Sequence, residues 1–344
     1  MSQKSGSLGR YFAIRLALAV PMVLILLTLV FFMMRVAPGD PITASSGGAK
    51  MSAEQIDAKR HAAGFDRPLL SQYGDYLGDV IRGDFGTTIS DHRPVMDIIV
   101  ENGGATLTLT LAAMVVALGV GIPLGRLAGR WRDTPFDVAT RLFGIVMYAA
   151  PAFVLGALAQ LVIVKKLHWL DDSSLQASPL VQLNTPTKTH ILIVDAMLAG
   201  DWDAVNDIFL HLILPAGTLG LIIAGVFIRM VRVNLIQTLR GDYVEAARAR
   251  GIAEKSVVNR HAFRNALVAV TTVVGMQFAI LLGGSVLTEK TFSWPGLGNQ
   301  LINYLNARDY IAVQGIVTFI AVVVVGISIL IDFVNALIDP RVRY

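Results

Sequence analysis

The residue types that carry chemistry in enzymes are few in this chain and widely spaced. It has no cysteine, which excludes disulfides and cysteine-based metal sites. A nucleotide-binding P-loop is approached only by Gly284 and Lys290-Thr291, where Glu289 stands in place of the second glycine. There is no Gly-x-Ser-x-Gly elbow and no His-Glu-x-x-His pair. The histidines are scattered, at His61, His92, His168, His190, His211 and His261. The sequence therefore predicts no catalytic residue, no metal site and no cofactor in this chain.

Ionisable groups inside the apolar segments are also scarce. Proton- or ion-driven transporters usually carry such groups along their pathway. Here only His211 lies within an apolar run, near its start, and Asp332 lies near the end of another. A lone histidine close to a helix end is usually hydrogen-bonded locally. We therefore expect a pathway whose energy comes from a partner.

The elements that must position any site are apolar helices. Only 16% of the 344 residues are charged, against about 25% in soluble domains. About 20 residues of helix cross the ~30 Å hydrocarbon core of a bilayer. Six runs without Asp, Glu, Lys or Arg approach or exceed that length: Leu16–Met34, Asn102–Gly125, Leu142–Val164, Ile208–Ile228, Asn265–Thr288 and Tyr310–Ile331. The sequence predicts an all-α membrane protein with six transmembrane helices, the first retained rather than cleaved as a signal.

Basic residues alternate between the predicted loops. Of the 29 Lys and Arg residues, 17 fall before the first run, after the second and fourth, and in the tail. The opposite loop Lys165–Asp207 has three Lys against six Asp. By the positive-inside rule, both termini are expected in the cytoplasm.

Two outer loops are long. In the first, Ser52 and Gln55 have capping-box spacing, which predicts a helix from Ser52 to about His61. The loop Lys165–Asp207 can form either a small folded cap or a plain connector. We expect residues 1–100 to provide the first helix and outer loop, and residues 101–344 to form a five-helix core.

The segment between the fourth and fifth runs, Arg229–Arg264, is the most informative. Asp242 suits the N-cap of a short helix, with Glu245 at capping-box spacing. Gly251 suits a residue of positive φ after its end. A helix Tyr243–Arg250 about 12 Å long is predicted, followed by a second helical stretch, Ala253–Phe263. From these features alone, an ordinary capped surface helix is the simplest interpretation.

The spacing Glu245-Ala246-Ala247-x3-Gly251 resembles the EAA loop of permease subunits of binding-protein-dependent ABC importers. In that family the loop forms the coupling helix that docks on the ATPase subunit. The resemblance assigns coupling to segment 240–264, with these residues at its centre: Asp242, Tyr243, Glu245, Ala246, Ala247, Arg248, Arg250 and Gly251.

The resemblance extends along nearly the whole chain and narrows to the dipeptide/oligopeptide branch. Its main matches are Arg35-Val-Ala-Pro-Gly-Asp-Pro41, Gly64-Phe-Asp-Arg-Pro68, Gly83-Asp-Phe-Gly86, Gly121-Ile-Pro-Leu-Gly125, Arg264-Asn-Ala-Leu267, Phe292-Ser-Trp-Pro-Gly-Leu-Gly298 and Asp339-Pro-Arg-Val-Arg-Tyr344. The general family often has Leu-Pro where Arg264–Leu267 stands here, and the loop Lys165–Asp207 is long for the branch.

The resemblance implies a type I ABC importer permease fold in the bacterial cytoplasmic (inner) membrane. It also implies a heterodimer with a second permease, two cytoplasmic ATPases that bind ATP and Mg, and an extracytoplasmic substrate-binding protein. Peptide import is the expected function. Related branch members carry nickel complexes, glutathione or oligosaccharides, and a stand-alone secondary transporter is the alternative class.

Glycine and proline mark two further features. Trp294-Pro295-Gly296 breaks the helix pattern after the fifth run, as in a gate-like re-entrant turn or an ordinary interfacial turn. Gly121, Gly125 and Gly129 form small-x3-small pairs that predict close helix packing.

Overall fold

The computed structural model describes residues 8–36, 52–62, 64, 66–170 and 175–338. Helices dominate these residues, and the β structure among them is one isolated bridge between Thr87 and Pro94. The motif at residues 35–41 is therefore described only at Arg35 and Val36, and the motif at residues 339–344 lies outside the described residues.

Four helices of the described chain are long and apolar enough to cross a membrane. They are α1 (Leu8–Val36), α5 (Val95–Arg130), α10 (Trp202–Thr238) and α17 (Tyr310–Ile338). Two bent helix pairs bring the number of candidate spans to six if each pair counts as one. The all-α membrane class is thus confirmed, and the six apolar runs correspond to these elements.

The third apolar run is not one straight helix. It divides into α6 (Pro135–Ala149) and a second part made of α7 (Ala152–Ala159) and η1 (Gln160–Lys166), which meet at 104°. Pro151 lacks a backbone N–H and disfavours helical geometry at the residue before it. Ala150 is accordingly extended, with ψ 134°. The third apolar run, Leu142–Val164, is therefore one candidate span with a sharp bend.

The fifth run is bent more gently. The run begins within α13 (Phe263–Ala266), at the end of an element that starts with α12 (Glu254–Ser256) and η2 (Val257–Ala262), and this element meets α14 (Val268–Gly284) at 50°. The predicted second helical stretch, Ala253–Phe263, is confirmed as the start of this bent element.

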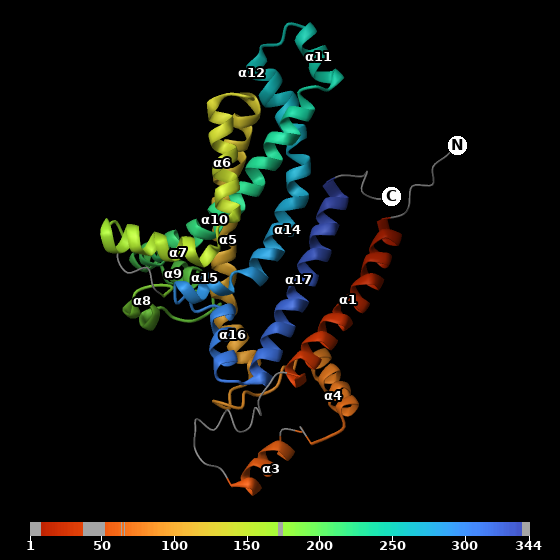
Figure 1. Ribbon diagram of the computed structural model, residues 1–344, viewed down its shortest axis with the longest axis vertical. Coiled ribbons are helices and arrows are strands. Elements are labelled where there is room, and N and C mark those ends of the chain that lie inside the picture. Colours follow the sequence, from red (N-terminus) through yellow and green to blue (C-terminus); the bar gives the residue numbers. More distant parts are fainter. Residues whose placement is uncertain (1–7, 37–51, 63, 65, 171–174, 339–344) are drawn as a thin grey trace.

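The centre of the bundle is the contact between α5 and α10 (Figure 1). A Cβ on Gly121 would lie 2.6 Å from Cβ of Phe227, and one on Gly125 would lie 2.7 Å from the carbonyl oxygen of Ile228. Only glycine allows this separation, so the predicted packing role of these glycines is confirmed. The buried side chains Leu109, Phe227 and Trp294 belong to the surrounding core.

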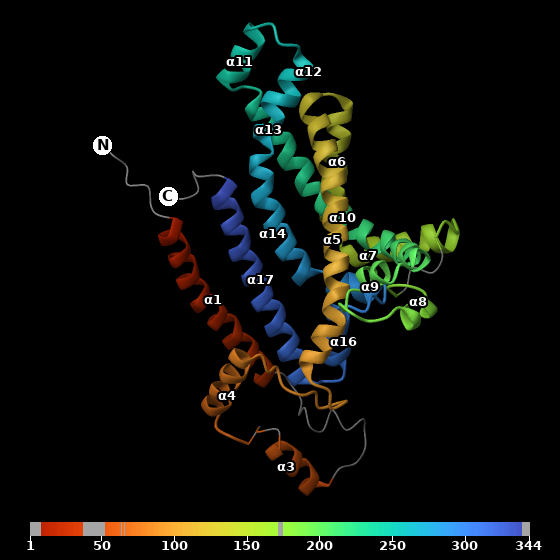
Figure 2. The same ribbon diagram turned by 180° about the vertical axis from the view of Figure 1, so that it is seen from behind.

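One end of the molecule carries α3 (Ala53–Ala62) and α4 (Leu69–Arg82), and the opposite end carries α11 (Asp242–Ala249) (Figures 1 and 2). We call these the α3 end and the α11 end. The predicted capping box of α3 is present: the Ser52 amide donates to Gln55 Oε1 at 3.0 Å, and the Gln55 amide donates to Ser52 Oγ at 3.3 Å.

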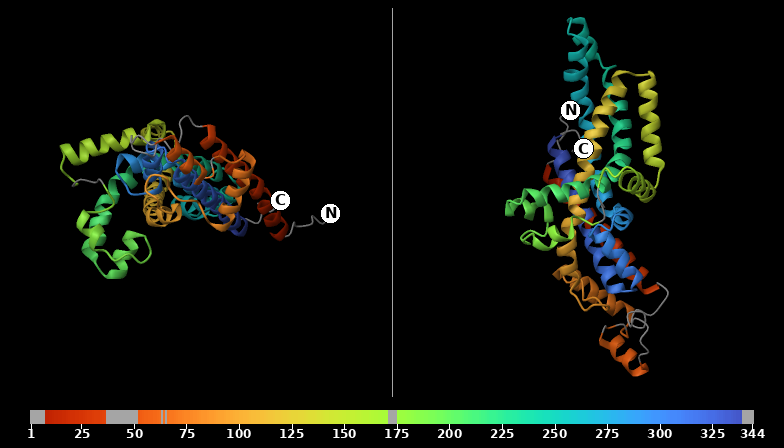
Figure 3. Two further views of the ribbon diagram at one scale, coloured as in Figure 1. Left: turned by 90° about the horizontal axis from the view of Figure 1, so that it is seen from below. Right: turned by 90° about the vertical axis from the view of Figure 1, so that its left-hand side faces the viewer.

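The long loop after η1 forms a small folded cap rather than a plain connector. It contains α8 (Pro179–Asn184) and α9 (Leu192–Ala199). Ala177 and Ala196 are fully buried in an apolar cluster that the loop forms with Ile208, near the start of α10. Figure 3 shows this cap and α7 projecting sideways from the long helices.

Two short helices, α15 (Val286–Thr291) and α16 (Leu297–Asn306), connect α14 to α17. Asp309, just after α16, fixes the segment before α5. Its Oδ2 accepts hydrogen bonds from the amides of Ile89 and Ser90 at 2.7 and 2.9 Å.

Candidate functional site

The short helix α11 lies between the long helix α10 and the fifth candidate span. It follows α10 directly and precedes α12 at the tip of the molecule (Figure 1). Its first residue is Asp242, and Gly241 is the N-cap with φ −77° and ψ 144°, without a side-chain capping bond. The predicted N-cap at Asp242 was therefore wrong by one residue. Extended Gly241 is the N-cap instead. Asp242 lies in the first turn, where its negative charge interacts favourably with the helix dipole.

The other end of α11 closes as predicted. Gly251 has φ +74°, its amide donates to the Arg248 carbonyl at 2.9 Å, and the Ile252 amide donates to the Ala247 carbonyl at 3.3 Å. These two bonds form a Schellman motif. Ile252 packs on the apolar cluster beneath the helix.

One face of α11 anchors it to the bundle. Val244 is fully buried and Ala247 is 5% exposed. They pack against Leu235 at the end of α10 and against Val257 and Ala262 in η2. A movement of α11 must therefore also move α10 or the start of the fifth span.

The opposite face of α11 is exposed. Besides Gly251 in the closing turn, the predicted coupling residues that lie exposed are Asp242, Tyr243, Glu245, Ala246, Arg248 and Arg250. The structure thus divides the predicted set: Ala247 holds the helix in place, and the exposed residues form a surface at the α11 end. We call these six residues the α11 face.

An ion pair stiffens the turn after α11. Arg248 Nη2 lies 2.7 Å from Glu254 Oε1, and its Nε lies 3.1 Å from Oε2. The hydrogen bonds with Glu254 raise the pKa of Arg248 above its usual value. Both side chains are about half exposed, so this pair orders the loop more than it stabilises the fold.

Two polar contacts near the α11 end connect neighbouring helices, and neither was predicted. Asp137 on α6 accepts two hydrogen bonds from Arg232 on α10, at 2.5 and 2.7 Å, and its side chain is fully buried. Arg126 on α5 donates to Asn259 in η2 at 2.5 Å and lies over the Phe263 ring at 4.9 Å. These contacts brace the helices from which α11 extends.

The predicted gate residues Trp294, Pro295 and Gly296 form a turn between α15 and α16 inside the bundle. The Trp294 side chain is fully buried, and its Nε1 donates to the Ala105 carbonyl of α5 at 2.9 Å. A Cβ on Gly296 would lie 2.6 Å from Thr106 Oγ1. The turn is therefore pinned to α5 rather than free at an interface.

Glu289 on α15 organises this turn, and sequence reasoning assigned it no such role. Its Oε1 accepts hydrogen bonds from Thr106 and Ser285, both at 2.9 Å, and its Oε2 accepts one from the Asn299 amide at 3.1 Å. Thr106 Oγ1 also accepts from the Leu297 amide at 2.8 Å. The carboxylate thus caps the start of α16 and connects it to α5.

The long apolar helices are those of a membrane protein, and the comparisons with known families give its class as a permease subunit. The chain matches two family models: the inner membrane component of binding-protein-dependent transport systems over residues 121–344, and the N-terminal region of such membrane components over residues 9–110. The chain belongs to this family of inner membrane transport components.

Curated relatives cover nearly the whole chain. The dipeptide transport system permease protein DppB of Escherichia coli (strain K12) is 36% identical over 332 residues, which is 96% of this chain and 97% of the relative. The di/tripeptide transport system permease protein DppB of Pseudomonas aeruginosa (strain UCBPP-PA14) is 35% identical over 97% of this chain and 98% of its own length. The dipeptide transport system permease protein DppB of Alkalihalophilus pseudofirmus is 32% identical over 96% and 98%.

Proposed function

We propose that this chain is a permease subunit of an ABC importer that carries peptides, most directly dipeptides and short oligopeptides, into the cytoplasm. The names of its full-length relatives support the substrate class. The mechanism rests on the α11 face. This surface is exposed at the tip of the molecule, while the other side of α11 packs against two candidate spans. An exposed, firmly seated helix of this kind is suited to receive force from a partner.

The proposed orientation places the α11 end in the cytoplasm, with both chain termini. The basic residues that cluster around α11 and before α6 support this orientation by the positive-inside rule. The α3 end and the α8–α9 cap then face outward, where an extracytoplasmic binding protein delivers the peptide.

The proposed assembly has four kinds of component: this chain, a second related permease, two cytoplasmic ATPases and the binding protein. ATP and Mg bind to the ATPases. The α11 face docks on one ATPase, and ATP-driven closure of the ATPases moves α10 and the fifth span through Val244 and Ala247. The pathway alternates between outward and inward access as a result.

The turn Trp294–Gly296 has a proposed role in the gate. Its hydrogen bonds to α5 make the turn, α15 and α16 move with α5 as one body. Residues 101–344 form the working core in this proposal, and residues 1–100 add the first span and outer surface.

The direct test is uptake by the purified complex in proteoliposomes. We expect a labelled dipeptide to accumulate only with the binding protein outside and ATP available to the ATPases. Uptake without ATP, driven by a proton or sodium gradient, would overturn the proposal in favour of secondary transport.

A further inference from the structure

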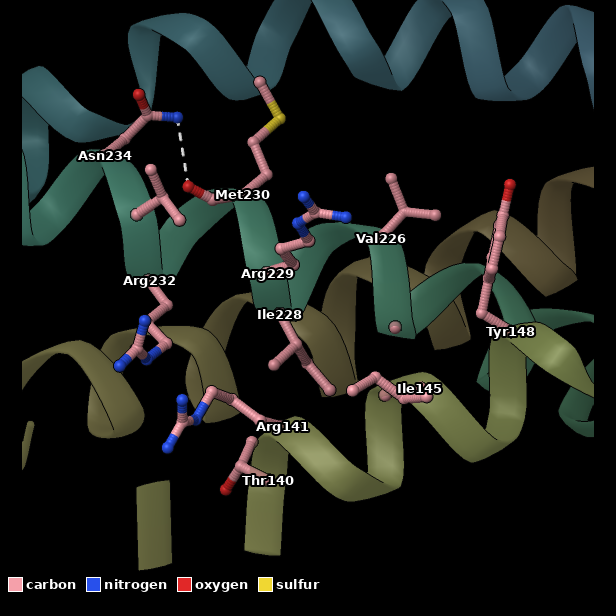
Figure 4. Close-up of a pocket in the computed structure, with 13 residues that line it drawn as sticks. Thr140, Arg141, Ile145, Tyr148, Val226, Ile228, Arg229, Met230, Arg232 and Asn234 are labelled. Carbon is pink, nitrogen blue, oxygen red and sulfur yellow. Dashed lines mark hydrogen bonds between the residues drawn. The ribbon is translucent and has the colours of Figure 1, made fainter. Parts of the chain in front are cut away.

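A pocket of about 710 Å³ lies between α6 and α10 (Figure 4). Its lining residues on α10 lie in the half of that helix that leads into α11. The helices cross closely at one of its walls, where Gly144 and Gly225 meet. Arg141, Ile145 and Tyr148 line it from α6, and Arg229, Arg232 and Asn234 line it from α10. Neither the family match nor the α11 face accounts for this pocket.

The pocket carries excess positive charge. Among the described residues, those that line it include three arginines and no acidic residue. Asp137, just behind the lining, is bound by Arg232 and lies 3.8 Å from Arg141. One carboxylate therefore accompanies three guanidinium groups, and Arg229 is exposed on α10.

The depth of these residues favours an aqueous passage. Arg141 directly precedes the third apolar run, and Arg229 directly follows the fourth. Tyr148 lies about two helical turns further into the third run and is 67% exposed. Arginines near the ends of spanning helices extend their guanidinium groups to the aqueous interface, so we expect the pocket to open to water at the α11 end.

We propose that this pocket is part of the peptide pathway near the α11 end, and that Arg141 and Arg229 bind carboxylate groups of the passing peptide. The inference rests on the proposed function. Peptides carry a terminal carboxylate, which pairs with a guanidinium in bidentate fashion. The same helix α10 carries Arg229 and leads into α11, so a movement of α11 changes the width of the pocket.

The cysteine-free chain allows a direct test of water access. Ile145 lines the pocket and Val146 does not, although both belong to α6 and are 63% and 57% exposed in the chain alone. In membrane vesicles with the complete importer, a charged thiol reagent should label Ile145→Cys at least about tenfold faster than Val146→Cys. Added peptide and binding protein should slow the labelling. Equal, slow labelling would overturn the inference, as would labelling that peptide leaves unchanged.

The second test separates the carboxylate from other ligands. The double variant Arg141→Gln, Arg229→Gln should lower uptake of an acidic dipeptide about tenfold more than uptake of the same dipeptide amidated at its carboxyl groups. The double lysine variant should recover part of the loss, and Arg132→Gln, outside the pocket, should show no such preference. The binding protein is a separate chain that the substitutions do not change. Its affinity for each peptide is measured, and the uptake of each peptide is corrected for it.

The first two of the following outcomes would overturn the role of the pocket and leave the proposed function intact. If the variants affect all peptides equally, and only in liposomes that contain anionic phospholipid, the arginines hold a lipid headgroup. If the wild-type complex takes up peptides normally and the variants match it, the pocket has no role in binding. If the wild-type complex takes up no peptide at all, the proposed function itself has failed.

Discussion

Asp137 and Arg232 form a two-point ion pair between α6 and α10, at 2.5 and 2.7 Å, with the carboxylate fully buried. The Asp133 amide also donates to Asp137, at 3.0 Å. Removing one partner of such a pair leaves an uncompensated buried charge, whereas replacing both with apolar residues is often tolerated. We expect Asp137→Ala to destabilise the protein by about 3–5 kcal/mol in thermal unfolding.

The matched control for this ion pair is the double variant Asp137→Leu, Arg232→Met. Its stability should lie closer to wild type than that of Asp137→Ala. A double variant less stable than the single one would mean that the charges do not act as a pair.

Thr106 holds the Trp294 turn through its hydroxyl group. That group donates to Glu289 and accepts from the Leu297 amide. Thr106→Ser keeps both hydrogen bonds and should remain near wild type. Thr106→Val loses both and leaves buried groups unsatisfied, which should cost about 1–3 kcal/mol. Proteolysis of the α15–α16 region would report the loss. Similar protection in the two variants would contradict the role given to Thr106.

The crossing of α6 and α10 depends on Gly225. A Cβ at this position would lie 2.6 Å from the Gly144 carbonyl oxygen, which belongs to the backbone and cannot move aside. Gly225→Ala should therefore separate the helices and destabilise the protein by about 1–3 kcal/mol. Gly217 lies on the same helix, and a Cβ there would meet no neighbouring atom within 4 Å. Gly217→Ala should be neutral or stabilising by up to about 1 kcal/mol, and melting temperatures of the two variants decide the comparison.

Gly251 ends α11 with a backbone that other residues adopt at a cost. Because its φ is +74° and its surroundings are open, the penalty for substitution is one of conformation and not of space. Asparagine tolerates this region, so Gly251→Asn should retain uptake. Proline fixes φ near −65° and lacks the amide that bonds to Arg248. Gly251→Pro should insert normally and lose uptake. Wild-type uptake by that variant would argue strongly against coupling through α11.

The sequence predicts the helices well because lipid imposes a simple rule. A spanning segment must exclude charge, so the run Tyr310–Ile331 identifies α17 without any knowledge of packing. Local chemistry was equally informative at Ser52 and Gln55, and at Gly251, where each signal lies within a few residues of its partner.

The sequence did not predict the direction of the helices or the side-chain pairs between distant parts of the chain. Apolarity does not show that the third span turns by 104° at Pro151, although the proline itself marks the position. Asp137 bonds a residue 95 positions away, and Thr106 bonds one 183 positions away. No short-range pattern records such pairs. Glu289 stands directly after the fifth apolar run, and an acid at that place was the available signal.

Site-specific cross-linking tests most directly whether the α11 face docks on an ATPase. In the cysteine-free chain, Ala246→Cys places one thiol on this face, and Leu70→Cys places one at the α3 end, where the side chain is 81% exposed. In the assembled importer, Ala246→Cys should cross-link to an ATPase subunit, with a yield that changes when ATP binds, and Leu70→Cys should not. Cross-linking to the ATPase from Leu70→Cys, with none from Ala246→Cys, would contradict both the orientation and the coupling role of α11.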